Sequence, residues 1–115
     1  MPYQQSNLLY CCMTKEQEIF YKQVSQINYK ISTHEGNANT RLASQCSKIL
    51  LLPKAVIPEK YQEKFNKLLK LIENTLNPIP GLLIPVKIDS IYNKTAVKYI
   101  ILLIELEDYF ADLNC

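Results

Sequence analysis

The sequence predicts an all-α fold, a compact bundle of four main helices. Apolar residues recur at spacings of three and four in four stretches of the chain. Only two glycines occur in 115 residues, which disfavours a turn-rich β-sandwich. Proline or glycine stands between the stretches and separates them. We expect residues 1–115 to form a single helical domain, with 1–13 as an N-terminal extension.

The first helix is expected to run from Thr14 to about Thr33. Thr14 and Gln17 have the spacing of a capping box, in which each side chain satisfies a backbone donor of the other residue. Gly36 and Asn37 tolerate left-handed backbone and are predicted to end the helix. One face carries the apolar residues Phe20, Val24, Ile27 and Ile31.

The second helix is predicted as one segment from Asn39 or Thr40 to Leu52. Pro53 follows directly and cannot continue it. Its apolar face consists of Leu42, Cys46, Ile49 and Leu50.

The third helix opens at Pro58, where the missing amide proton costs nothing in the first turn. Pro78 and Pro80 interrupt the chain beyond it. Its predicted buried stripe consists of Tyr61, Phe65, Leu68, Leu69, Ile72 and Leu76.

A long Pro-rich and apolar connection, residues 77–89, joins the third helix to the fourth. It is longer than most connections in compact domains. Because it is so apolar, we expect it to pack across the bundle or at an interface. The sequence leaves open whether its 79–88 part is a loop or a short strand.

The fourth helix is expected from about 90–93 to about Leu113. Its apolar residues cover most of the circumference, which is typical of a central helix contacted on several sides. Glu107 falls within this apolar arc, and we expect it to pair with a lysine or to lie past the edge of the core.

A polar stripe follows one side of the same helix, within about 80° at 100° per residue. Lys94 and Lys98 come first, and acidic residues follow in the second half. The stripe is either an ordinary solvated face or a docking patch for a basic protein. The candidate partner-binding residues are Glu105, Asp108 and Asp112, with Tyr109 at their border.

A second charged surface is basic and follows the third helix. Such a face could neutralise nucleic-acid phosphates. However, glutamates interleave with the lysines, Arg41 is the sole arginine, and the isoelectric point near 8.3 is mild for a nucleic-acid domain. Nucleic-acid binding is therefore the alternative function and not the favoured one. Its residues would be Lys54, Lys60, Lys64, Lys67 and Lys70.

No combination of residues in the sequence points to catalysis, a cofactor or a metal. His34 is the sole histidine, and we expect it to interact with the end of the first helix. The four cysteines lack zinc-site spacing. No export signal and no span of about 18 apolar residues is present, so we expect reduced thiols, a cytoplasmic location and no membrane insertion.

These features predict a small cytoplasmic protein-binding module that inhibits or regulates another protein, not an enzyme. An inhibitor of the immunity or antitoxin type fits best, and its target would be a bacterial toxin with a basic cleft, such as a nuclease. Self-association through Tyr99–Leu106 or Leu82–Val86 remains a further alternative.

Overall fold

The computed structural model describes residues 13–75 and 93–113. All regular structure in these two ranges is helical, so the predicted all-α class is confirmed. The connection 77–89, Leu76 and most of the N-terminal extension lie outside the described residues. The elements are α2 (Lys15–Thr33), α3 (Ala38–Ala43), α4 (Cys46–Leu50), the 3-10 turn η1 (Lys54–Val56), α5 (Glu59–Thr75) and α6 (Asn93–Leu113).

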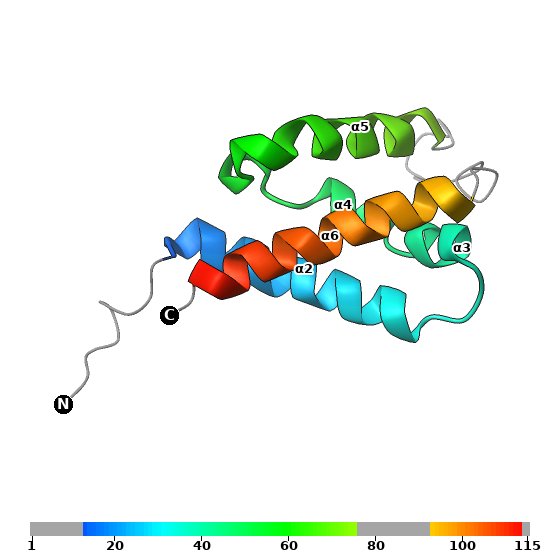
Figure 1. Cartoon of the computed structure of the whole chain (residues 1–115), viewed down its shortest axis with the longest axis horizontal. Coiled ribbons are helices and arrows are strands. Elements are labelled where there is room, and N and C mark those ends of the chain that lie inside the picture. Colours follow the sequence, from blue (N-terminus) through cyan, green and yellow to red (C-terminus); the bar gives the residue numbers. More distant parts are fainter. Residues whose placement is uncertain (1–12, 76–92, 114–115) are drawn as a thin grey trace.

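Helix α6 lies at the centre of this arrangement. It runs between α2 and α5 and antiparallel to both, while α3 packs near its N-terminal end (Figure 1). Helix α4 contacts α2 and α5. Three helices therefore contact the last helix, as expected of a central helix, although its outer side stays exposed.

Helix α2 begins as the sequence predicts. The amide of Gln17 donates to Oγ1 of Thr14 at 3.1 Å, and the amide of Thr14 donates to Oε1 of Gln17 at 2.9 Å. This is a complete capping box. The four residues of the predicted apolar face are the buried residues of this helix: Phe20, Val24, Ile27 and Ile31.

Helix α2 ends where the sequence predicts, but not through the residues predicted to end it. The helix stops at Thr33, and Gly36, with φ +106°, lies in the loop beyond the cap instead of ending the helix. Asn37 is not left-handed, because it is the extended N-cap of α3 with φ −80°. The hydroxyls of Ser32 and Thr33 both donate to the carbonyl of Tyr29 at 2.9 Å. These local side-chain bonds compete with the helical backbone bonds at the end of α2.

The second predicted helix is two short helices, so its continuity was wrong. The break falls at Ser44 and Gln45, where Gln45 has φ −114° and ψ 10°. The Ser44 hydroxyl donates back to the carbonyl of Arg41 at 2.7 Å, a local bond that competes with helix continuation. The break allows α3 to pack on α6 and α4 to pack on α5.

Helix α5 follows Pro58, and the amide of Tyr61 donates to the Pro58 carbonyl at 2.9 Å. Its Tyr61 side chain is half-buried. The fully packed members of the predicted stripe are Phe65, Leu68, Leu69 and Ile72.

Helix α6 buries only one side. Its core residues fall within an arc of about 120° at 100° per residue. Val97, Ile101 and Ile104 lie on the opposite side and keep 44%, 48% and 44% of their surface exposed. The apolar residues cover most of the circumference of this helix, but only those on one side are buried in the core. The buried residues are Ala96, Tyr99, Leu102, Leu103, Leu106 and Phe110.

A polar clamp joins α2 to α6. The Asn28 amide nitrogen donates to the carbonyl of Leu103 at 3.0 Å and to Oε1 of Glu107 at 2.8 Å. Glu107 thus lies at the edge of the core and binds an amide, in place of the lysine considered from the sequence. The Oδ1 atom of Asn28 is buried without a hydrogen-bond partner in the described structure.

We expect Asn28→Ala to lower the free energy of unfolding by about 1–3 kcal/mol, because the half-buried Glu107 carboxylate and the Leu103 carbonyl lose a shared donor. Urea denaturation followed by circular dichroism measures this change. The control is Asn66→Ala on the exposed side of α5, which we expect to change stability by less than about 0.5 kcal/mol. Equal stability of the two variants would contradict the role of the clamp.

Candidate functional site

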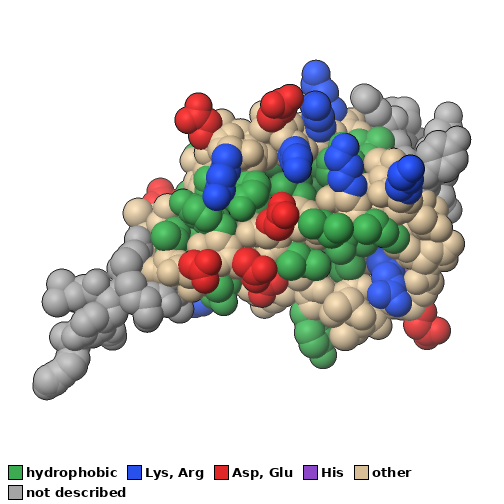
Figure 2. Space-filling model, in the orientation of Figure 1, with side chains coloured by type: hydrophobic (Ala, Val, Ile, Leu, Met, Phe, Trp, Pro, Cys, Tyr) green, Lys and Arg blue, Asp and Glu red, His purple; other side chains and the backbone are tan. Residues whose placement is uncertain are grey.

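The most distinctive surface is the side of α6 that faces away from the core, which we call the outer α6 face. Its residues occupy an arc of about 120°, opposite the buried arc. Figure 2 shows hydrophobic side chains over the middle of α6 and acidic ones toward its C-terminal end. The face consists of Lys94, Val97, Lys98, Ile101, Ile104, Glu105, Asp108 and Asp112, all exposed.

The structure places the predicted acidic residues together on this face. Glu105, Asp108 and Asp112 are all exposed. Within the described ranges, none of the three carboxylates forms an ion pair, since the pair found there joins Lys67 and Glu63. These carboxylates are therefore hydrated and available to an external cation.

Tyr109 lies at the margin of the outer α6 face, and its ring packs mainly in the contact between α5 and α6. Its ring makes edge contacts with Tyr61 at 6.1 Å and with Phe110 at 5.2 Å between ring centroids. The ammonium of Lys60 lies 5.1 Å from the Tyr61 centroid and 5.4 Å from the Tyr109 centroid, a cation–π arrangement. A partner would reach only the smaller part of Tyr109 that remains exposed.

Four of the five lysines of the alternative site belong to α5, and Figure 2 shows basic side chains on this side of the molecule. Lys60 lies over the two tyrosine rings, and Lys67 lies 3.5 Å from the carboxylate of Glu63. Lys64 and Lys70 are exposed on the same helix, whereas Lys54 belongs to η1. Part of this basic charge is thus already engaged within the protein.

Residues with catalytic side chains are not brought together in the described structure. His34 is exposed as the C-cap of α2, and its Nδ1 lies 2.6 Å from the carbonyl oxygen of Glu35. Cys46 is buried in the core and donates weakly to the carbonyl of Leu42 at 3.7 Å. Among the described residues no group of three His, Cys, Asp or Glu side chains has the geometry of a metal site.

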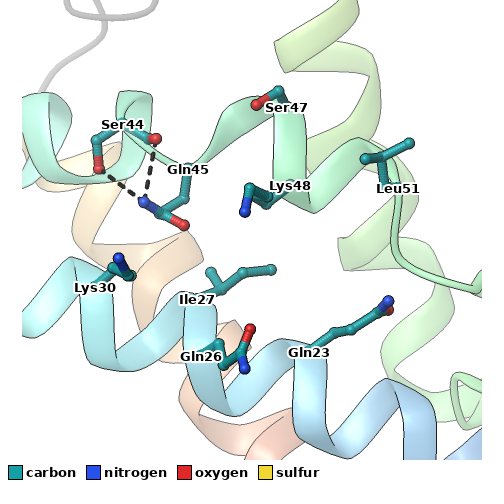
Figure 3. A pocket seen from close by; sticks show the side chains of 9 residues that line it. All are labelled: Gln23, Gln26, Ile27, Lys30, Ser44, Gln45, Ser47, Lys48 and Leu51. Atoms are coloured by element: carbon teal, nitrogen blue, oxygen red, sulfur yellow. Dashed lines mark hydrogen bonds between the residues drawn. The ribbon is translucent and has the colours of Figure 1, made fainter.

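A polar hollow of about 530 Å³ lies between α2 and the α3–α4 segment (Figure 3). Its lining offers amides, hydroxyls and two ammonium groups. The Gln45 amide is occupied by hydrogen bonds to Ser44, as Figure 3 shows. Leu51 also lines the hollow, and 75% of its surface is exposed to solvent. The other lining residues are Gln23, Gln26, Ile27, Lys30, Ser47 and Lys48.

A smaller hollow, of about 330 Å³, borders the outer α6 face. Val97 and Ile104 belong to both, so one edge of the aliphatic row forms part of the wall of this hollow. The other lining residues are Asn28, Ile31, Ser32, Gly36, Ala38, Arg41 and Ile100.

The sequence pattern identified the charges of this face but did not separate its aliphatic centre from the other apolar residues of a central helix. Ile101 and Ile104 fall within the segment Tyr99–Leu106 that was considered for self-association, without a face being assigned to them. The helical angle of each residue could have revealed them, because they fall on the same side as Lys98 and Glu105.

The chain matches no protein-family model, no curated protein and no solved structure. None of the described helices is both long enough and apolar enough to cross a bilayer.

Burial raises the pKa of the Cys46 thiol from 9.0 to about 11. The folded state therefore holds the neutral thiol, and this contribution to stability is complete below about pH 9. It is lost as the pH rises toward 11, because the unfolded chain ionises first. We expect the wild type to lose about 2–3 kcal/mol more unfolding free energy than Cys46→Ala between about pH 8 and pH 11. Urea denaturation at each pH measures the difference, and parallel stability curves would contradict it.

Proposed function

We propose that the chain is a protein-binding module and that the outer α6 face is its interface. The observation that carries this proposal is an exposed aliphatic row beside unpaired carboxylates on the central helix. An aliphatic centre with a charged rim is the usual anatomy of a protein interface. The aliphatic centre supplies apolar burial, and the rim selects partners by charge.

The position of the face suits recognition because its backbone is held in place. The other side of α6 is locked by α2, α3 and α5 and by the Asn28 clamp. A face on such a helix loses little conformational entropy on binding, so more of the contact energy appears as affinity.

The charge pattern supports a partner with a basic surface. The exposed carboxylates of Glu105, Asp108 and Asp112 attract cationic side chains on a binding partner. We therefore propose a cytoplasmic inhibitor of the immunity or antitoxin type, with carboxylates that occupy the place of phosphates in the basic cleft of a toxin such as a nuclease. Such an inhibitor acts by covering its target and needs no catalytic group of its own.

A nucleic-acid-associated regulator is the second candidate, supported by the four exposed lysines of α5. It has less support, because Lys60 and Lys67 are engaged within the protein. This candidate requires binding that weakens steeply with salt, since phosphate contacts release counterions. An electrophoretic mobility shift with short DNA and RNA duplexes at low salt tests it.

We expect Glu105→Lys/Asp108→Lys to weaken partner binding by at least about tenfold, because two attractive rim charges become repulsive. The wild-type chain is used to isolate a basic protein from the native host, and that purified protein is then titrated calorimetrically with each variant.

The matched control is Glu35→Lys/Glu73→Lys, which changes the net charge equally at exposed positions away from α6. We expect the control to bind like the wild type apart from a small effect of net charge. Equal binding by the face variant, with an unchanged circular dichroism spectrum, would exclude the acidic face as the interface.

A further inference from the structure

The outer α6 face is complementary to itself. We propose that a second copy of this chain binds there, with the two α6 helices antiparallel across a two-fold axis at Ile101. The inference goes beyond the proposed function, because it names a second occupant for the same surface.

The order of residues along α6 carries the proposal. The basic residues stand in the N-terminal half of the face, the aliphatic ones in the middle and the acidic ones in the C-terminal half. Lys94 and Asp108 are equally distant from Ile101 in the sequence, while Lys98 and Glu105 differ by one residue. An antiparallel pair centred on Ile101 therefore brings Lys94 of each copy level with Asp108 of the other.

The aliphatic residues follow the same symmetry. Val97 precedes Ile101 by four residues, and Ile104 follows it by three. Across the two-fold axis, the Val97 end of each helix meets the Ile104 end of the other, and Ile101 meets its own copy. All three side chains are 44–48% exposed, so contact would remove a continuous apolar strip from water.

The charges of the isolated helix are arranged against its dipole. The first turn of α6 holds Lys94 and no acid, and the last turn holds Asp112 and no base. Helix N-termini favour anions and C-termini favour cations. In the antiparallel pair the N-terminal half of each helix faces the acids of the other copy. The second copy thus supplies the charges that each helix end lacks.

The shape of the surface also suits inserted aliphatic side chains. The hollow of about 330 Å³ lies along the Val97 and Ile104 side of α6, with Ile100 and Ile31 in its lining. It leaves room for aliphatic side chains below the rim of the face. A parallel arrangement would instead place lysine beside lysine and acid beside acid, which is repulsive.

A basic protein and a second copy of the chain would compete for the outer α6 face, because both would bind the carboxylates of Glu105 and Asp108. A basic partner would have to displace the second copy, so dimer formation would lower the apparent affinity for that partner. If the dimer does not form, the proposed binding of a basic protein still stands, and the two ideas are tested separately.

The first experiment measures the mass of the purified chain by sedimentation velocity and light scattering from about 1 µM to about 1 mM. We expect the mass to rise from monomer to dimer over this range. We expect Ile101→Ser to weaken the association by at least about tenfold. Ile19→Ser is the matched control, since Ile19 on α2 is 43% exposed, and we expect it to dimerise like the wild type. A monomer at every concentration overturns the proposal, and so does equal dimerisation of both variants.

The second experiment exchanges charges at low salt. One variant is Lys94→Glu/Lys98→Glu and the other is Glu105→Lys/Asp108→Lys. Each alone brings like charges together and is expected to stay monomeric, whereas an equimolar mixture is expected to form a heterodimer. The circular dichroism spectrum of each variant confirms that it is folded.

Rescue in the mixture requires that basic residues of one copy meet acidic residues of the other. A mixture that stays monomeric, or variants that dimerise alone like the wild type, would overturn the antiparallel pairing. The pair Lys94→Glu and Asp108→Lys repeats the test with one substitution per chain if a double variant does not fold.

Discussion

A single constraint organises this protein: its most apolar helix can bury only one side. Helix α6 inserts Leu103, Leu106 and Phe110 between its neighbours α2 and α5, and these residues are fully buried. The fully buried residues fall within an arc of about 120°, and the helix carries aliphatic side chains well beyond that arc. The surplus residues are left facing outward, so the candidate interface is a direct consequence of how the core is filled.

Specific contacts fix the rotation of α6 and so decide which residues form that surface. Asn28 binds the backbone at Leu103 and the carboxylate of Glu107, while the Phe20 and Phe110 rings pack at 5.0 Å. A turn of the helix by one residue, about 100°, would break these contacts and drive charged side chains toward the core. The polar clamp therefore holds the recognition surface in place, and its Asn28 also lines the hollow that borders this surface.

The distribution of charge separates two kinds of surface. Lysines of α5 have partners within the protein, in the tyrosine pair under Lys60 and in Glu63 beside Lys67. The charges of the outer α6 face have no ion-pair partner in the described structure and surround an apolar centre. Unsatisfied charge beside exposed aliphatic surface favours association with another protein, because contact both pairs the charges and excludes water.

The sequence by itself determined where α2 begins, through the Thr14 capping box, and which stripes of α2 and α5 are buried. These depend on local backbone donors and on helical period, which the order of residues specifies directly. The tertiary structure decided the break at Ser44, the partner of Glu107 and the exposure of Ile101. The partner of Glu107 and the exposure of Ile101 depend on which helices lie nearby, because a side chain is paired or buried only where another element reaches it. The break at Ser44 combines a local hydrogen bond with the packing of α3 on α6 and of α4 on α5.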